Sequence, residues 1–404
     1  MKTAYALVVG FLLLCLSAGG TPSTEAGAVS GVFYVGGTGP GNFSSLQEAV
    51  GAAEAGDTIV VLGGIHPPVE VNVSLSLEGR GAVVGGFSVY ADSVRISGFL
   101  IQGAAYGVYM QGRHNEISNC TIFNNSYGIK IQGNGNVVRD NKIFKNRHYA
   151  LGLRYSFQGS MVRNAIYWNQ WGIYLEHSED NDVLFNLLHH NGQGIRILGG
   201  SDNIIGGNHL ANNSEYGIKM CCSSHHNSIF GNNFIDNQIP AYAYTADENR
   251  WDQNGTGNYW GNISHHTAYV IDDENADYHP ATTPFAVPQF DYQIFVLQPM
   301  PHQILSGPVV VRGVSEQEGT VEVRVDNGTW QRAVGFLTWQ YLLDTADLDN
   351  GPHRLSLRCG PAQTDYYFQV QNEAASGFAV LLSLAVFATL AVARRLSAGK
   401  QKKI

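Results

Sequence analysis

Residues 221–226 carry the side chains with the clearest capacity for metal chemistry in this chain of 404 residues. The segment holds two adjacent cysteines and, after two serines, two adjacent histidines. Thiolate and imidazole ligands together suit copper(I) or zinc. The alternative is a solvated turn without an ion, and other histidine doublets, such as that at 189–190, show no ligand spacing. The candidate metal ligands are Cys221, Cys222, His225 and His226.

Two carboxylates, Asp180 and Asp202, occupy the same position of successive sequence repeats, and His226 occupies it in the next repeat. If the repeats stack as parallel strands, these side chains lie about 4.8 Å apart on consecutive coils. Neighbouring carboxylates raise one another's pKa and can form an acid/base pair. Asp180 and Asp202 are therefore the candidate catalytic residues. No column of Arg or Lys meets them, so the sequence favours binding over catalysis and leaves enzymatic activity open.

Aromatic residues form columns of their own. One column precedes a column of small residues, a polar strip runs beside it, and Phe123, Phe144 and Tyr167 form a second run. Stacked aromatic rings along a groove suit a glycan chain, whereas the alternative is that like rings stack on neighbouring coils only because stacking is stabilising. The candidate ligand-binding residues are Tyr106, Tyr127, Tyr149, Trp171 and Tyr216, and the strip beside them is Tyr109, Lys130, Tyr174, Arg196 and Lys219.

An internal repeat must position all of these groups. Its first apolar residue recurs at steps of 21 to 24 residues, and asparagine recurs three and eight residues later in most units. The segments are short and alternating, which predicts strands, and Asn tolerates the left-handed backbone of bends. Stacked amides can hydrogen-bond along a column. We therefore predict an all-β, right-handed parallel β-helix of about seven clear coils, with repeats starting at Ile96, Ile117, Val138, Met161, Val183, Ile205 and Ile229.

Further modules flank the repeats. A capping helix is predicted from Ser45 to about Ala55, because Ser45 and Glu48 form a capping box. Alternating segments after a proline-rich shift predict a small β-sandwich. The predicted organisation is a signal peptide (1–28), an N-terminal strand, capping helix and first coils (29–92), β-helix repeats (93–262), a closing segment and linker (263–287), an Ig-like β-sandwich (288–372), a transmembrane helix (373–393) and a basic tail (394–404).

The two ends of the chain indicate export. Lys2 precedes a short apolar run and small residues, as in a secretory signal peptide. Near the other end, residues 374–393 carry no charge and are long enough to span a bilayer, with Arg394 and Arg395 directly after them. We expect a single-pass membrane protein whose N-terminal part is extracellular. The net charge of −9 excludes a nucleic-acid partner. Cys120 lies about four coils from Cys221 and Cys222, which excludes a disulfide to either of them.

Specific motifs resemble the NosD-type β-helix family. They are the opening from Ser45 to Ile59, the repeat motif Tyr127-Gly128-Ile129, and the closing motif Gly257-Asn258-Tyr259-Trp260. The resemblance implies either a role in copper-site maturation or membership of a wider group of carbohydrate-binding and sugar-hydrolysing β-helices. The chain departs from the family after Trp260, where the acidic segment is reduced to residues 272–277.

The combined expectation is a membrane-anchored extracellular β-helix on an Ig-like stalk, with surface binding or structural display directed at carbohydrate as its function. The alternatives are a NosD-like accessory protein in copper handling and a polysaccharide lyase or hydrolase. Copper and calcium are the metals that these alternatives would use, and the sequence does not decide between them. It also does not indicate an oligomeric state.

Overall fold

The structure of the chain is a computed structural model that describes residues 31–37, 42–261, 267–299 and 303–372. The predicted signal peptide, transmembrane helix and basic tail lie outside these residues. Within the described ranges, no helix is long and apolar enough to cross a membrane.

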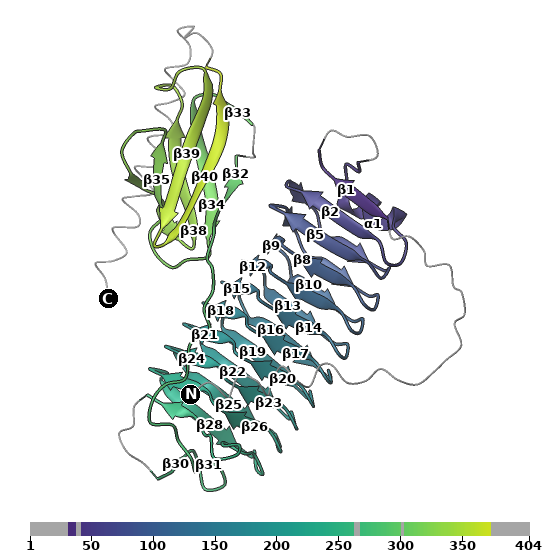
Figure 1. Cartoon of the computed structure of the whole chain (residues 1–404), viewed down its shortest axis with the longest axis vertical. Coiled ribbons are helices and arrows are strands. Elements are labelled where there is room, and N and C mark those ends of the chain that lie inside the picture. Colours follow the sequence, from purple (N-terminus) through teal and green to yellow (C-terminus); the bar gives the residue numbers. More distant parts are fainter. Residues whose placement is uncertain (1–30, 38–41, 262–266, 300–302, 373–404) are drawn as a thin grey trace, which may run out of the picture. The chain divides into compact units, whose positions relative to one another are not determined.

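Three parallel sheets run side by side along residues 32–260 and form a β-solenoid (Figure 1). Each coil contributes one strand to each sheet, and short turns join the strands. Sheet A consists of β1 (Val32–Val35), β2 (Thr58–Leu62), β5 (Ser76–Arg80), β8 (Arg95–Ser97), β11 (Glu116–Ser118), β14 (Val137–Arg139), β17 (Ser160–Val162), β20 (Asp182–Leu184), β23 (Ile204–Gly206) and β26 (Ser228–Phe230).

The other two sheets follow the same order along the axis. Sheet B consists of β3 (Ile65–His66), β6 (Val83–Val84), β9 (Leu100–Gln102), β12 (Thr121–Phe123), β15 (Lys142–Phe144), β18 (Ala165–Tyr167), β21 (Leu187–His189), β24 (His209–Ala211), β27 (Asn233–Ile235) and β29 (Tyr259–Trp260). Sheet C consists of β4 (Val69–Val71), β7 (Phe87–Val89), β10 (Tyr106–Met110), β13 (Tyr127–Ile131), β16 (Tyr149–Arg154), β19 (Trp171–Glu176), β22 (Gln193–Leu198), β25 (Tyr216–Cys221) and β28 (Ile239–Tyr244).

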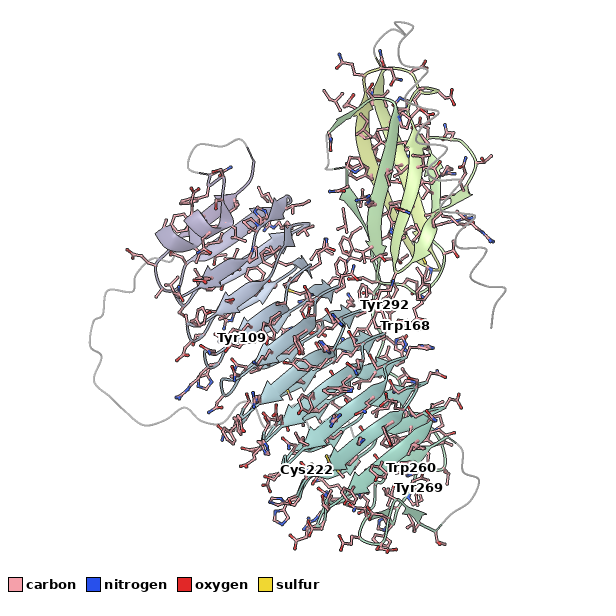
Figure 2. All side chains as sticks on the ribbon, turned by 180° about the vertical axis from the view of Figure 1, so that it is seen from behind. Tyr109, Trp168, Cys222, Trp260, Tyr269 and Tyr292 are labelled. Atoms are coloured by element: carbon pink, nitrogen blue, oxygen red, sulfur yellow. The ribbon has the colours of Figure 1, made fainter. Side chains whose placement is uncertain are left out.

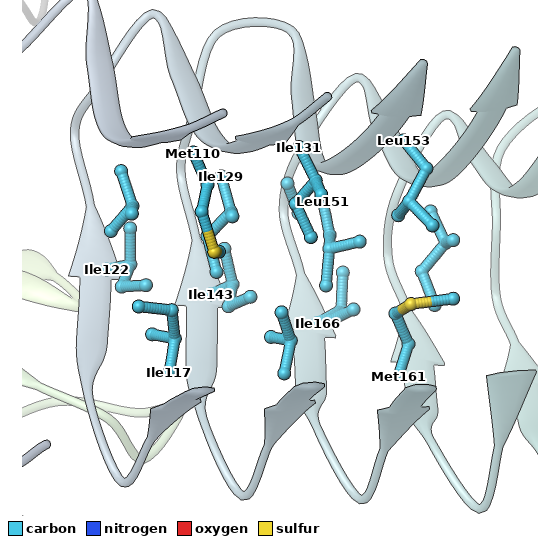
Figure 3. Packing of buried hydrophobic residues seen from close by; sticks show 14 of the residues in the cluster. Met110, Ile117, Ile122, Ile129, Ile131, Ile143, Leu151, Leu153, Met161 and Ile166 are labelled. Atoms are coloured by element: carbon cyan, nitrogen blue, oxygen red, sulfur yellow. The ribbon is translucent and has the colours of Figure 1, made fainter. Parts of the chain in front are cut away.

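The strand register confirms the sequence repeat. All seven predicted repeat starts, from Ile96 to Ile229, pair with one another in sheet A. These side chains are fully buried and stack with apolar residues of the other two sheets along the axis (Figure 3). The core is therefore a continuous column, and each coil depends on its neighbours to bury its apolar face.

Buried asparagines line the bends between sheets. The longest ladder of hydrogen bonds starts at Cys120 and ends at Asp277. In it, the side-chain oxygen of each Asn accepts from the backbone N–H of the ladder residue one coil earlier. The asparagines of this ladder are Asn141, Asn164, Asn186, Asn208, Asn232 and Asn258. These side chains satisfy buried backbone groups that the turns would otherwise leave unpaired.

Both ends of the solenoid are covered. Helix α1 (Leu46–Ala52) is N-capped by Ser45, which accepts a hydrogen bond from the Glu48 amide, and it ends three residues before the predicted limit. At the other end Trp260 stacks on Tyr269 with ring centroids 3.8 Å apart (Figure 2). A short hairpin of β30 (Tyr269–Val270) and β31 (Ala276–Asp277) carries that tyrosine. These covers shield the open edges of the terminal coils.

A second module lies between residues 294 and 370 and contains two sheets around one shared apolar core. One sheet has the order β32 (Ile294–Gln298), β34 (Pro308–Ser315), β38 (Thr338–Asp344) and β37 (Val334–Phe336). The other has the order β33 (Ile304–Leu305), β40 (Ala362–Val370), β39 (Gly351–Cys359), β35 (Glu322–Val325) and β36 (Gln331–Arg332). The pairings are antiparallel except for that between β33 and β40.

Candidate functional site

The outer face of sheet C carries two columns of outward-facing side chains. Inward residues such as Ile129 and Ile131 alternate with outward residues such as Lys130 along each strand, as strand geometry requires. In the predicted aromatic column, Tyr106 pairs with Tyr127, and the register runs on from Tyr149 through Trp171, Gln193 and Tyr216 to Ile239. The second column consists of Tyr109, Lys130, Gly152, Tyr174, Arg196, Lys219 and Tyr242.

Aromatic rings contact one another along this face. The rings of Tyr106 and Tyr127 stack with centroids 5.1 Å apart, and those of Tyr127 and Tyr149 lie 4.7 Å apart. Tyr109 lies on the same face (Figure 2), with its ring centroid 5.6 Å from that of Tyr106. Except for Tyr149, which is buried, these rings are partly exposed. They present flat apolar surfaces with polar hydroxyl tips, which is the character of sugar-binding aromatics.

Cationic groups lie over these rings. The Lys130 ammonium is 5.2 Å from the ring centroid of Tyr106, and the Lys219 ammonium is 4.7 Å from that of Tyr216. The Arg196 guanidinium lies 4.5 Å above the Trp171 ring. Its Nε atom is buried and has no hydrogen-bond partner in the described part of the chain. Ring contacts fix the position of a cation without neutralising its charge, so these groups stay available to an anion.

A hollow of about 210 Å³ opens at the point where the second column has a glycine. Gly152, between Lys130 and Tyr174 in this column, makes room for the Tyr149 ring, because a Cβ atom added there would lie 2.6 Å from that ring. Tyr149, Lys130 and Tyr174 all line the hollow. The other lining residues include Tyr106, Tyr127, Arg154 and Glu176.

The electrostatics of the hollow favour hydrogen-bond donation and positive charge. Burial, followed by neighbouring tyrosines and Glu176, raises the pKa of Tyr149 above its usual range. Burial and then Glu176 raise the pKa of Tyr174 to about 12. Both hydroxyls therefore stay protonated at neutral pH. The carboxylate of Glu176 pairs with Arg154 at 3.2 Å, which leaves Lys130 as the cation on that rim without a carboxylate partner in the described part of the chain.

The second aromatic run has a different role. Phe123, Phe144 and Tyr167 stack in register on sheet B, with centroids 5.4 and 4.9 Å apart. All three are buried and share an apolar cluster with Val314 and Leu337 of the second module. This run is therefore packed against protein and is not a surface for a ligand.

The candidate carboxylates lie at exposed bends with left-handed backbone. Asp180 and Asp202 have φ values of 55° and 57°. Asp202 lies 3.8 Å from His226 Nδ1, as the predicted stacking of this column requires. The Nε2 atom of His226 lies 2.7 Å from Glu248, which sequence reasoning did not include. This column is an exposed acid–histidine row, separate from the hollow at Gly152.

In the cysteine–histidine turn at 221–226, the two cysteines contact each other, but the two histidines contact other groups. The thiol sulfurs of Cys221 and Cys222 lie 3.0 Å apart, and both residues are free cysteines. Burial, followed by the hydrogen bond to Cys222, raises the pKa of Cys221 to about 11. His225 Nδ1 contacts the carbonyl oxygen of Ser223 at 2.9 Å, and His226 contacts Glu248 instead of the thiols.

A different group has the geometry for a metal ion in the described part of the chain: His189, His190 and Glu318. The doublet at 189–190 shows no ligand spacing in the sequence, and the structure brings a third ligand-type group, Glu318, beside it. This third group comes from the second module, 128 positions later in the chain, so no local spacing rule detects it.

Comparisons with known proteins agree with the solenoid. The family described as "Periplasmic copper-binding protein (NosD)" matches residues 56–265. No curated protein matches the chain. Among solved structures, the pectate lyase Pel9A is similar at 16% identity over 60% of this chain and 83% of the lyase, with a TM-score of 0.44.

Two epimerases are also similar. The periplasmic alginate epimerase AlgG shares 14% identity over 58% of this chain and 74% of its own, with a TM-score of 0.29. The A-module of the mannuronan C-5 epimerase AlgE6 from Azotobacter vinelandii shares 12% identity over 60% and 94%, with a TM-score of 0.34. No conclusion about activity follows from these likenesses.

Proposed function

The chain belongs to the NosD family, and we propose that its β-helix binds an acidic polysaccharide along the outer face of sheet C. The observation that supports this most strongly is the hollow at Gly152 between aromatic rings and cations. The ring faces suit the C–H faces of sugars, and the cations suit carboxylate or sulfate groups on the polymer. Tyrosine hydroxyls at the rim supply donors for sugar oxygens.

The shape of the face suits a polymer better than a small molecule. The aromatic and cationic columns continue over seven strands, from β10 to β28, so contacts repeat at the strand spacing of about 4.8 Å. A polymer can meet several of these contacts at once, and many weak contacts along a chain add up to strong binding.

The charge on this face selects the type of polymer. The chain as a whole carries a net charge of −9, which would repel a polyanion at long range. Sheet C reverses that sign locally, because Lys130, Arg196 and Lys219 face outward there, whereas Arg154 is paired with Glu176. We therefore expect uronate or sulfated polymers to bind and neutral glucans to bind weakly.

The same proposal includes the cellular location of the protein. The apolar segment 373–393 followed by basic residues would anchor the chain, and the two-sheet module would act as the Ig-like stalk. The β-helix would then display sheet C outside the cell.

The test uses the full-length chain in detergent and affinity electrophoresis in gels containing polygalacturonate, alginate or dextran. The binding variant is Lys130→Ala with Arg154→Ala. The matched control is Arg80→Ala with Arg95→Ala, which removes two exposed cations from sheet A.

We expect the binding variant to lose at least about tenfold in affinity for the acidic polymers and the control to stay within about twofold. Added salt should weaken binding of the parent protein. Equal retention of dextran, or an equal loss in the control, would refute the proposal.

A further inference from the structure

His189 and His190 lie at the end of β21, and Glu318 lies in the connection between β34 and β35. The Nδ1 atoms of the two histidines are 2.9 Å apart. Glu318 Oε1 lies 3.4 Å from His189 Nδ1 and 3.7 Å from His190 Nδ1. Three ligand-type atoms thus form a small triangle in a partly buried position.

The size of this triangle matches one face of a tetrahedral zinc site. Zinc binds histidine nitrogen and carboxylate oxygen at about 2.0–2.2 Å, which places neighbouring ligands of a tetrahedron roughly 3.3–3.5 Å apart. The observed separations of 2.9, 3.4 and 3.7 Å bracket that value. A zinc ion would therefore fit if the ligand atoms shifted by a few tenths of an ångström, about the size of a small side-chain rotation.

Neighbouring rings hold the ligands in this orientation. The His189 ring stacks on Tyr167 with an interplanar angle of 11°, and the His190 ring stacks on Trp168 with an angle of 7°. Trp168, labelled in Figure 2, also donates its indole N–H to Glu318 Oε1 at 3.0 Å. Outer contacts of this kind fix ligand orientation in metal sites.

The types of ligand also suit zinc. Imidazole nitrogen and carboxylate oxygen are both common zinc ligands. Two histidines and one glutamate also form the protein ligand set of zinc sites that keep a fourth position open.

We propose that Zn²⁺ binds His189 Nδ1, His190 Nδ1 and Glu318 Oε1, with the fourth position open to water. This site is independent of the glycan face on sheet C. It also differs from the cysteine–histidine turn at 221–226. The ion would join the solenoid to the second module, because two ligands come from one and the third from the other.

The test measures zinc bound by the full-length chain in detergent after chelation and dialysis, by competition with a chromophoric chelator. The site variant is His189→Gln with His190→Gln, and Glu318→Gln removes the third ligand alone. The matched control is His225→Gln with His226→Gln, a second histidine doublet of the same chain. Circular dichroism and binding of acidic polymer report whether each variant is folded.

We expect one zinc per parent chain, loss of that zinc in the doublet variant, and an affinity at least about tenfold lower in Glu318→Gln. The control should keep its zinc. Cobalt at the site should give the intense visible absorption of tetrahedral coordination, and this signal should disappear in the site variant. Absence of zinc uptake by the parent, or loss of zinc in the control instead of the site variant, would overturn the proposal.

Discussion

Replacing Asn186 with alanine should destabilise the solenoid more than any exposed substitution nearby. Asn186 is fully buried in the middle of the longest asparagine ladder. Its Oδ1 atom accepts from the backbone N–H and the side-chain amide of Asn164, at 2.9 and 3.0 Å. Its amide donates to the Met161 carbonyl at 2.8 Å and to Asn208 Oδ1 at 3.0 Å. The substitution removes all four bonds.

The magnitude follows from the groups that lose their partner. The Asn164 side-chain amide still donates to two carbonyls, and Asn208 Oδ1 still accepts from the Asn186 backbone. The Asn164 backbone N–H and the Met161 carbonyl lose these side-chain contacts. A buried polar group left unpaired costs about 1–3 kcal/mol. We therefore expect Asn186→Ala to lower the free energy of unfolding by about 3 kcal/mol.

The assay is urea unfolding followed by tryptophan fluorescence. Its control is Asn212→Gly, because Asn212 is exposed in the next coil and glycine tolerates its φ of 52°. The control should change the free energy of unfolding by less than about 0.5 kcal/mol. A loss below about 1 kcal/mol in Asn186→Ala would show that the ladder does not satisfy buried backbone groups as reasoned.

Three further predictions concern single positions. Gly152→Leu should displace the Tyr149 ring, which lies 2.6 Å from the position of the added Cβ atom, and lower affinity for acidic polymer by about tenfold, measured by affinity electrophoresis. Burial raises the pKa of Asp277 against the hydrogen bonds it accepts, so its contribution to stability is full below the ordinary value and is lost as pH rises through the folded value. The free energy of unfolding of the parent, measured with urea, should therefore fall relative to that of Asp277→Asn as pH rises from about 4. In reduced protein, iodoacetamide should label exposed Cys222 before buried Cys221, as peptide mass spectrometry would show.

The periodic part of the fold could be predicted from the sequence because its cause is local and repeated. Most coils have one apolar residue inward and one asparagine at the bend, so residues like Val138 and Asn141 recur in most units. The aromatic column on sheet C followed from the same register. The hollow did not, because it depends on the absence of a side chain at Gly152 between two larger neighbours.

Contacts between residues far apart in the sequence are the second part of the structure that the sequence could not predict. Phe144 and Tyr127 belong to equally regular aromatic columns, but only the first column is buried by residues of the second module. Glu318 joins two histidines for the same reason, since its partners are far away in sequence. Register within a repeat predicts which residues share a face, whereas a distant segment decides whether that face meets solvent.

The three faces of the solenoid therefore differ in what they leave available to a ligand. On sheet A, Arg139 pairs with Glu116 at 2.5 Å, so carboxylates already compensate its charge. On sheet B, the aromatic run is covered by apolar residues of the second module. On sheet C, Lys130 and Arg196 are held by neutral rings. A cation–π contact at an exposed site contributes only about 0.5–1 kcal/mol and leaves the charge intact, so sheet C is the face on which a polyanion meets both uncompensated cations and open aromatic surface.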